Sequence, residues 1–357
     1  MSLSRLAVLV GTALIGFGLP MPVAAVSPAP TAQREDSPLA VSWLQRAATA
    51  PDRVSFHGIQ IITSWGPQGA SSAMLDILHA AKQGSEISVV GAGPPGAKAF
   101  VQRAAETAGP TVDGGPLALL RATYELVYKG RTETIGRPAV LIEALRADRT
   151  LAARFWIDKA TGLLLQRQLY AGDGRTMVRA TVYTELEVHG AYFLSHLPPM
   201  VPSGVTSIGL GRVDSLRSRG WNCMNELPAS LKLYDVRTDA AGGSLQFSYS
   251  DGLFAVSLFE QRGGLDPAAV AGYTVSNTPE GAQVYIRQGM PSYAVWSSGG
   301  IVYTLIGDIP YDVLATVVAA FPHEPPRRVT AIERVGTGLA KMAMWITPVG
   351  ALSRKLG

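Results

Sequence analysis

Residues 246–258 read Gln-Phe-Ser-Tyr-Ser-Asp-Gly-Leu-Phe-Ala-Val-Ser-Leu, two aromatic-rich runs with Asp251-Gly252 between them. An Asp-Gly pair supplies the positive φ values that a tight hairpin turn requires. The stretch therefore predicts a β-hairpin. Similar strand-like runs, joined by short polar turns, occur through most of the chain.

The first half of the chain contains several segments rich in β-branched and aromatic residues. They are Val54–Trp65, Glu86–Val90, Tyr124–Tyr128, Ala139–Leu145, Ala152–Ile157, Leu163–Leu169 and Met177–Val188. Turns as short as Gly130-Arg131 join the later ones, and strands joined so closely run antiparallel, because a parallel crossover needs a dozen or more residues. Ser37-Pro38 is typical of a helix start, with Ser37 as N-cap. We therefore expect a meander with a helix at its start.

A second antiparallel domain is predicted after a Pro- and Gly-rich segment. Its expected strands are Leu231–Thr238, Ser244–Ser250, Leu253–Gln261, Ala282–Gln288, Tyr293–Ser298 and Gly300–Ile306. A helix is expected to begin at Pro310 and to end before Pro322, which cannot continue it. The fold class is thus α+β, predominantly antiparallel β, in two domains.

The length and the N-terminus set the wider organisation. The 357 residues allow two domains, and 47% hydrophobic against 16% charged residues excludes wholesale disorder. Arg5, the apolar run Leu6–Leu19 and Val23-Ala24-Ala25 have the pattern of a signal peptide cleaved near Val26, although an uncleaved membrane anchor stays open. The expected parts are a signal peptide (1–25), a flexible lead-in (26–37), a first domain (38–195), a linker (196–211), a second domain (212–322) and a basic tail (323–357).

Motifs for catalysis or cofactor binding are weak. Gly91, Gly93 and Gly96 form a G-x-G-x-x-G, but a dinucleotide site also needs an acidic residue on a parallel strand about 20 residues later. That position is the turn Asp113–Pro116, so a loop is the better interpretation. The histidines show no metal-ligand spacing, and no G-x-S-x-G is present. We predict no enzyme, no catalytic residues, no cofactor and no metal.

Cys223 is the single cysteine, so no intramolecular disulfide can form. A half-buried structural thiol is the expected role, and an intermolecular disulfide is the alternative.

The C-terminal tail has a basic amphipathic pattern. Ile332, Val335, Leu339, Met342, Ala343 and Ile346 share one helical face. Arg334 and Lys341 lie opposite this face, and Trp345 falls outside it. Such a helix suits the surface of an anionic membrane, whereas docking on its own domain is an equal alternative.

Several motifs together resemble the RseB/MucB family of exported envelope-stress regulators. Besides the Tyr249–Phe254 hairpin, they are Gly136–Ala139, Phe155–Asp158 with Thr161–Leu165 and Asp173-Gly174, Trp221 with Leu227-Pro228, and Ile306–Pro310. Their order and spacing carry the resemblance, which spans most of the mature chain. The loop after Val90 and the basic tail depart from the family pattern.

The resemblance implies a LolA/LolB-like half-barrel as the N-terminal domain, able to enclose an acyl chain, and a smaller C-terminal α+β domain. It implies an extracytoplasmic protein, in the periplasm or cell envelope, that binds the extracytoplasmic segment of a membrane anti-sigma factor and shields it from proteolysis until a lipid-like ligand releases it. We place the ligand among Phe56, Tyr124, Leu126, Phe155 and Leu165, and partner contacts at Tyr249, Asp251, Gly252, Leu253 and Phe254. The main alternative is a lipid or lipoprotein carrier without a signalling role, and an envelope hydrolase is the weaker one. Nucleic-acid binding is not expected.

Overall fold

The computed structural model describes residues 36–66, 69–90, 100–103, 116–189, 205–239, 242–278, 281–288, 291–307 and 309–324, all within one compact unit. The expected signal peptide, the glycine motif 91–96 and the tail residues Arg334, Lys341 and Trp345 lie outside these ranges. Among the described residues, no helix has both the length and the apolar character to span a membrane.

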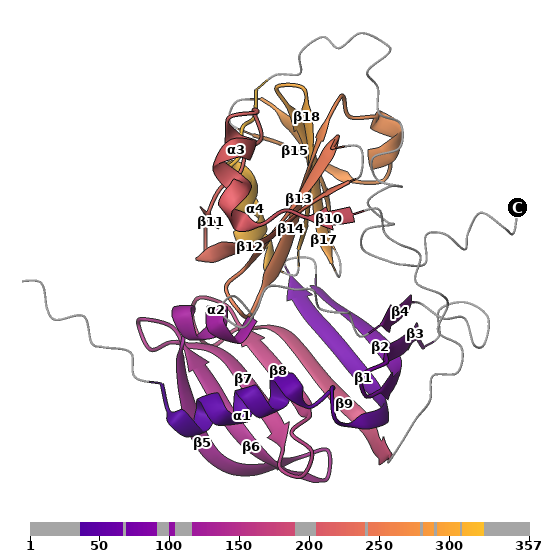
Figure 1. Ribbon diagram of the computed structural model, residues 1–357, viewed down its shortest axis with the longest axis vertical. Helices are drawn as coiled ribbons and strands as arrows, with labels where there is room; N and C mark the ends of the chain where they lie inside the picture. The colour runs from indigo at the N-terminus through magenta and orange to yellow at the C-terminus, as the bar shows by residue number, and fades with distance from the viewer. Residues whose placement is uncertain are drawn as a thin grey trace, which may run out of the picture. The chain divides into compact units, whose positions relative to one another are not determined.

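The first domain is one nine-stranded sheet with two helices (Figure 1). Its elements are α1 (Pro38–Thr49), β1 (Ser55–Gly66), β2 (Gly69–Ala80), β3 (Gly84–Val89), β4 (Phe100–Arg103), α2 (Pro116–Thr123), β5 (Glu125–Thr134), β6 (Arg137–Leu145), β7 (Leu151–Asp158), β8 (Leu164–Tyr170) and β9 (Met177–His189). The strand order is β4-β3-β2-β1-β9-β8-β7-β6-β5, so the sheet is open, with β4 and β5 at its edges. Every pairing in it is antiparallel, as the short turns predicted.

The sheet is not the simple meander that we expected. Between β4 and β5 the chain crosses through α2 to the opposite edge, and β1 then pairs with β9, with Phe56 opposite Val188. The strand β2 was also missing from the prediction, because Gly69–Ala80 is rich in alanine and serine, which favour strands little. Its pairing with β1 along the whole strand stabilises it instead.

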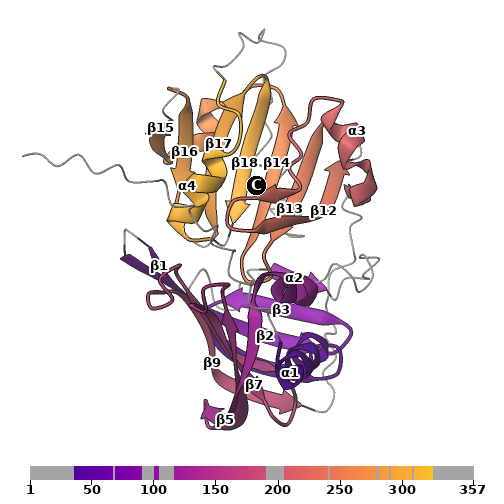
Figure 2. The same ribbon diagram turned by 90° about the vertical axis from the view of Figure 1, so that its left-hand side faces the viewer.

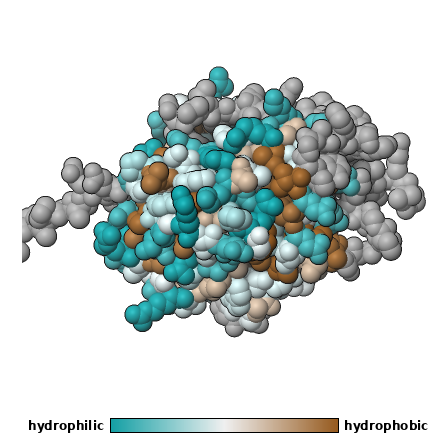
Figure 3. Space-filling model, turned by 90° about the horizontal axis from the view of Figure 1, so that it is seen from below, coloured by the Kyte–Doolittle hydropathy of each residue, from teal (hydrophilic) through white to brown (hydrophobic). Residues whose placement is uncertain are grey.

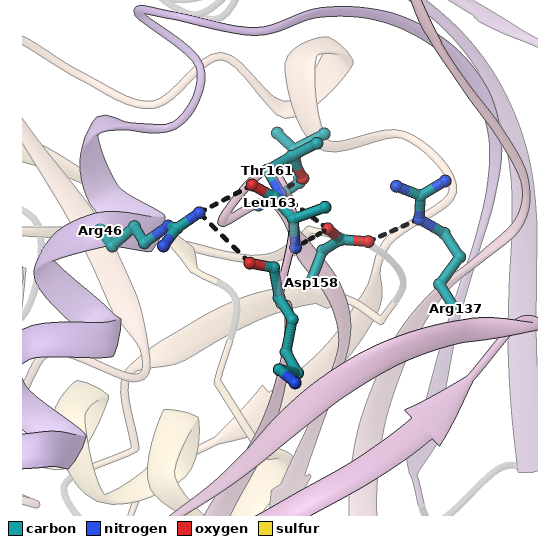
Figure 4. A network of polar contacts seen from close by, with 7 residues as sticks. Arg46, Arg137, Asp158, Thr161 and Leu163 are labelled. Carbon is teal, nitrogen blue, oxygen red and sulfur yellow. Dashed lines mark hydrogen bonds and ion pairs between the residues drawn. The ribbon is translucent and has the colours of Figure 1, made fainter.

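The turn between β7 and β8 fastens α1 to the sheet (Figure 4). The buried carboxylate of Asp158 accepts hydrogen bonds from the backbone N–H groups of Ala160 and Thr161, each at 2.8 Å, and pairs with Arg137 Nε at 2.5 Å. The guanidinium of Arg46 on α1 donates to the carbonyl oxygens of Lys159 and Ala160 at 3.2 and 2.7 Å. These bonds fix the helix over one end of the sheet.

The second domain is a second antiparallel sheet (Figure 2). Its elements are β10 (Val205–Ser207), η1 (Leu210–Arg212), α3 (Val213–Arg217), β11 (Glu226–Leu227), β12 (Leu231–Asp239), β13 (Ser244–Ser250), β14 (Ala255–Arg262), η2 (Pro267–Val270), β15 (Thr274–Asn277), β16 (Gln283–Arg287), β17 (Ser292–Ser298), β18 (Ile301–Gly307) and α4 (Tyr311–Ala319). The order is β10-β12-β13-β14-β18-β17-β16-β15, with β11 also paired to β12. Within the expected linker, Val205–Ser207 joins this sheet as β10.

Among its described residues, the second domain has one main apolar core and two smaller apolar clusters, around Phe259 and around Val295. Residues of α3 and α4 pack with the inward side chains of the central strands around Trp296, which stacks on Tyr303 with ring centroids 5.0 Å apart. The α+β class and the predominantly antiparallel sheets are therefore confirmed.

Candidate functional site

The five residues predicted to line a ligand cavity are all buried, and they fall into two packed clusters. Tyr124, Leu126 and Phe155 share one with α1 residues, whereas Phe56 and Leu165 belong to a neighbouring one. In this structure the five side chains pack against other apolar groups. A ligand would therefore have to displace some of those groups, and a lipid cavity at these positions stays a prediction.

The predicted β13–β14 hairpin forms, but its loop spans residues 251–254 rather than Asp251-Gly252 alone, and Gly252 is the residue of that pair with a positive φ. The tip of the hairpin packs against the first domain. Asp251 is 3% exposed and Leu253 is 5% exposed. Leu253 belongs to the same apolar cluster as Tyr124 and Leu126, and Phe254 contacts the cores of both domains. Tyr249 is buried in the second-domain core. Contact of these residues with a partner protein stays a prediction, and here their neighbours belong to the same chain.

Gly252 is required at the tip for two reasons. Its φ is +93°, a conformation that residues with a side chain rarely adopt. A Cβ at this position would lie 2.3 Å from the backbone nitrogen of Leu120 on α2. The hairpin backbone therefore lies directly against the backbone of α2.

Asp251 joins the two domains through its carboxylate. Its Oδ1 accepts hydrogen bonds from the backbone N–H groups of Leu253 and Phe254 at 2.8 and 2.7 Å, which hold the turn in shape. Its Oδ2 accepts a hydrogen bond of 2.6 Å from the hydroxyl of Tyr124. Burial, together with the charge of Asp251, raises the pKa of Tyr124, so this phenol remains a donor.

Arg167 on β8 is the positively charged side chain that contacts the hairpin tip. Its guanidinium donates a hydrogen bond to the carbonyl oxygen of Leu253, while its Nε has no hydrogen-bond partner among the described residues. Burial lowers the pKa of Arg167, and the negative charge of Asp251 offsets part of this effect. The tip thus supplies this partly buried cation with both a carbonyl oxygen and a nearby carboxylate.

Sequence reasoning missed Arg167, although a signal was present. The residues at alternate positions along β8, Leu165 and Leu169, are fully buried. The two-residue period of a strand places Arg167 on the same inward side. A charged residue on a buried strand face marks a site more specifically than the apolar residues beside it.

A groove of about 210 Å³ lies beside the tip. Its lining comes from the β1–β2 turn, from β9, from Phe254, from the segment that leads into α4, and from Gln288 and Ser292 on either side of the β16–β17 turn. Trp65 and Tyr311 in this lining are 41% and 37% exposed. Burial and the charge of Arg167 lower the pKa of Arg179, also in the lining, to about 10. The groove therefore combines exposed aromatic rings with a partly desolvated cation.

Other surfaces are less specific. On the face seen in Figure 3, hydrophilic and hydrophobic residues are mixed. Single exposed apolar residues such as Met74 and Val188 are ordinary on protein surfaces. Among the described residues, no group of three His, Cys, Asp or Glu side chains could hold a metal ion. The tip with its groove is thus the best-defined candidate site.

Comparison with known proteins identifies part of the chain. Residues 94–201 match the model of the MucB/RseB N-terminal domain. This part of the chain is similar to the N-terminal domain of the MucB/RseB family. The match confirms the resemblance that the sequence motifs indicated, and it includes Tyr124, Phe155 and Arg167.

Solved structures of MucB are similar to the chain as well. The structure of the Pseudomonas aeruginosa MucA/MucB complex matches with 19% identity, over 80% of this chain and 99% of that chain, at a TM-score of 0.46. MucB in complex with MucA(peri) matches with 19% identity over 80% and 100%, at 0.43. A LolA superfamily protein from Nitrosomonas europaea matches with 10% identity over 43% of this chain and 94% of that chain, at 0.19. No curated protein sequence matches the chain.

Proposed function

We propose that the protein is an extracytoplasmic regulator of the MucB/RseB type, a binding protein rather than an enzyme. It binds the extracytoplasmic segment of a membrane anti-sigma factor and shields it from proteolysis until a lipid-like ligand releases it. The observation that carries the proposal is the match of residues 94–201 to the model of the MucB/RseB N-terminal domain. The function is therefore inferred from the partner that the family implies, and not from a catalytic arrangement of side chains.

The groove beside the hairpin tip supports this proposal. An extended peptide can place an apolar side chain against Trp65 and Tyr311 and an acidic group near Arg179. Phe254 is the hairpin residue that lines the groove, and its side chain is only partly buried. It can therefore make the partner contact that was predicted for the hairpin. The other tip residues act by holding Phe254 in place.

Calorimetric titration tests the function. The mature chain, from Val26, is titrated with the extracytoplasmic segment of an anti-sigma factor from the same genome, and a scrambled segment is the control. Saturable binding with a Kd near 1 μM or tighter, about −8 kcal/mol, is expected. The absence of binding to all such segments would contradict the regulatory function and favour the lipid carrier.

A pair of variants tests the place of binding. Phe254→Ala is expected to weaken the affinity for the partner segment at least about tenfold, the range of an interface anchor residue. Val275→Ala, at an exposed apolar position on β15, is the matched control and is expected to leave the affinity unchanged. Equal affinities of the two variants would place the partner elsewhere.

A further inference from the structure

The hairpin tip occupies the part of the first domain where a ligand was predicted. Leu253 and Phe254 pack on the cluster that contains Tyr124, Leu126 and Phe155, three of the five predicted ligand contacts. Two apolar side chains from the second domain thus fill space against the first-domain core that an acyl chain would need. The tip is an intramolecular occupant of that space.

The tip offers the first domain the same kinds of acceptor that an anionic ligand would offer. Asp251 brings a carboxylate to the Tyr124 hydroxyl, and Leu253 brings a carbonyl oxygen to Arg167. If the tip left, the partly buried guanidinium of Arg167 would lose both groups, and its Nε has no hydrogen-bond partner among the described residues even now, so the loss is costly. An incoming anionic group would replace both contacts at once.

The groove depends on the docked tip. Phe254 forms its wall on the hairpin side, and Trp65 and Arg179 of the first domain form another part of the lining. Departure of the tip removes the Phe254 wall and separates these residues. The groove is thus complete while the tip is docked and incomplete when the tip has left.

We propose that residues 251–254 are a latch, and that an amphiphile with an anionic head and an apolar chain binds the first domain by displacing it. The proposal rests on the proposed function and gives it a coupling device: the partner segment binds the latched form, in which the groove is complete, and the amphiphile binds the unlatched form. Each ligand then lowers the affinity of the protein for the other.

Two glycine variants separate the latch from general strain. Gly252→Ala introduces a Cβ 2.3 Å from the Leu120 nitrogen and so forces the tip away from α2. Gly281→Ala is the matched control, because Gly281 has a similar φ of +83° but open space around its Cβ position. Both variants share the cost of a positive φ, and Gly252→Ala alone disturbs the latch.

The probe is dodecanoate, used below its micelle concentration, with dodecanol as the neutral counterpart. Gly252→Ala is expected to bind dodecanoate about tenfold more tightly than the parent, because the competing occupant is removed. Gly281→Ala is expected to bind like the parent, and dodecanol is expected to bind more weakly because it leaves Arg167 uncompensated. Equal dodecanoate affinities of the two glycine variants, or no dodecanoate binding to either, would overturn the proposal.

Hydrogen exchange of residues 117–124 reports the latch without the partner. Dodecanoate is expected to raise the exchange of this α2 peptide in the parent protein. If Gly252→Ala does not fold, Leu253→Ala replaces it, since this change weakens the docking contact from the second-domain side and leaves Tyr124 and Arg167 in place for the ligand. If dodecanoate binds Gly252→Ala more tightly than the parent and raises the exchange of residues 117–124, but no partner segment binds, the proposed function is contradicted and the latch is retained. Partner binding that dodecanoate leaves unchanged would overturn the latch and retain the function.

Discussion

Removal of the hydrogen bond between Tyr124 and Asp251 tests how strongly this contact stabilises the docked tip. Tyr124→Phe removes the phenol and leaves a buried carboxylate oxygen without that donor. We expect the free energy of unfolding to fall by about 1.5–3 kcal/mol, the range for hydrogen bonds to charged groups. Urea unfolding followed by circular dichroism measures it.

Tyr285→Phe is the control for that measurement. The Tyr285 hydroxyl donates a 3.0 Å hydrogen bond to Gln283 on the exposed surface of the second domain. Its loss is expected to cost less than about 0.5 kcal/mol, because water replaces an exposed partner. Similar losses in both variants would show that the tip contact contributes no more than a surface bond.

Glu260 in the second-domain core makes stability depend on pH. Its side chain is fully buried; Oε2 accepts a 2.9 Å hydrogen bond from the backbone N–H of Asn222, and Oε1 has no partner among the described residues. Burial raises the pKa of Glu260 from its ordinary 4.5 to about 7. The folded state therefore favours the protonated carboxyl.

The sign of the effect follows from that pKa. Below pH 4.5 the carboxyl is protonated in both states and costs nothing, whereas above pH 7 folding must bury its charge. This loss amounts to about 3 kcal/mol. We expect Glu260→Gln to remove most of the loss, measured as the difference between variant and parent in urea unfolding at pH 4.5 and pH 8. A difference that does not change with pH would contradict the raised pKa of Glu260.

At the scale of elements, the glycines of the β7–β8 and β5–β6 turns differ in what they contribute. Gly162 has a φ of +85°, and a Cβ there would lie 2.8 Å from Cγ of Arg46 on α1. Gly136, in the β5–β6 turn, has a φ of +69° and open space. The first glycine therefore serves both turn and packing, and the second serves the turn alone.

Alanine at these two positions separates the two roles. Gly136→Ala is expected to lower the free energy of unfolding by about 1 kcal/mol, the cost of the positive φ. Gly162→Ala is expected to cost at least about 1 kcal/mol more, because Arg46 must also shift from its bonds to the turn. Thermal unfolding compares the two. A smaller loss for Gly162→Ala would show that α1 is not fastened by this turn.

The elements that could be predicted are those whose signal is local. The strands from Ala139 to Val188 and the hairpin at Asp251-Gly252 combine β-branched or aromatic runs with turn residues, and all of them form. The strand β2 was missed because Gly69–Ala80 is rich in alanine and serine. The helix α2 was missed because Pro116–Thr123 packs on residues that are distant in sequence, such as Ala40 and Leu253. Local composition carries little information about such pairings.

At the scale of the whole molecule, the site joins segments that no short window contains. Tyr124 and Asp251 are 127 positions apart, and Arg167 and Leu253 are 86 apart. The sequence pattern indicated that Tyr124 and Leu253 matter, but it assigned one to a ligand and the other to a partner. Their contact, which makes them parts of one site, appears only in the folded chain.

This contact predicts that a change in the second domain destabilises the first. Leu253 is 5% exposed, and its side chain packs with Tyr124 and Leu126 of the first domain. Leu253→Ala leaves a cavity there, which typically costs about 2–5 kcal/mol. We expect the parent protein to unfold in one calorimetric transition and Leu253→Ala in two, the first-domain transition being the one shifted to lower temperature.

Val275→Ala on the exposed edge strand β15 provides the comparison and is expected to retain one transition. Two transitions in the parent protein would mean that the tip does not couple the domains at equilibrium. A single, lowered transition in Leu253→Ala would instead mean that other contacts couple them and that Leu253 contributes stability alone. Two transitions confined to Leu253→Ala are expected because its side chain is the part of the second domain that completes the core of the first.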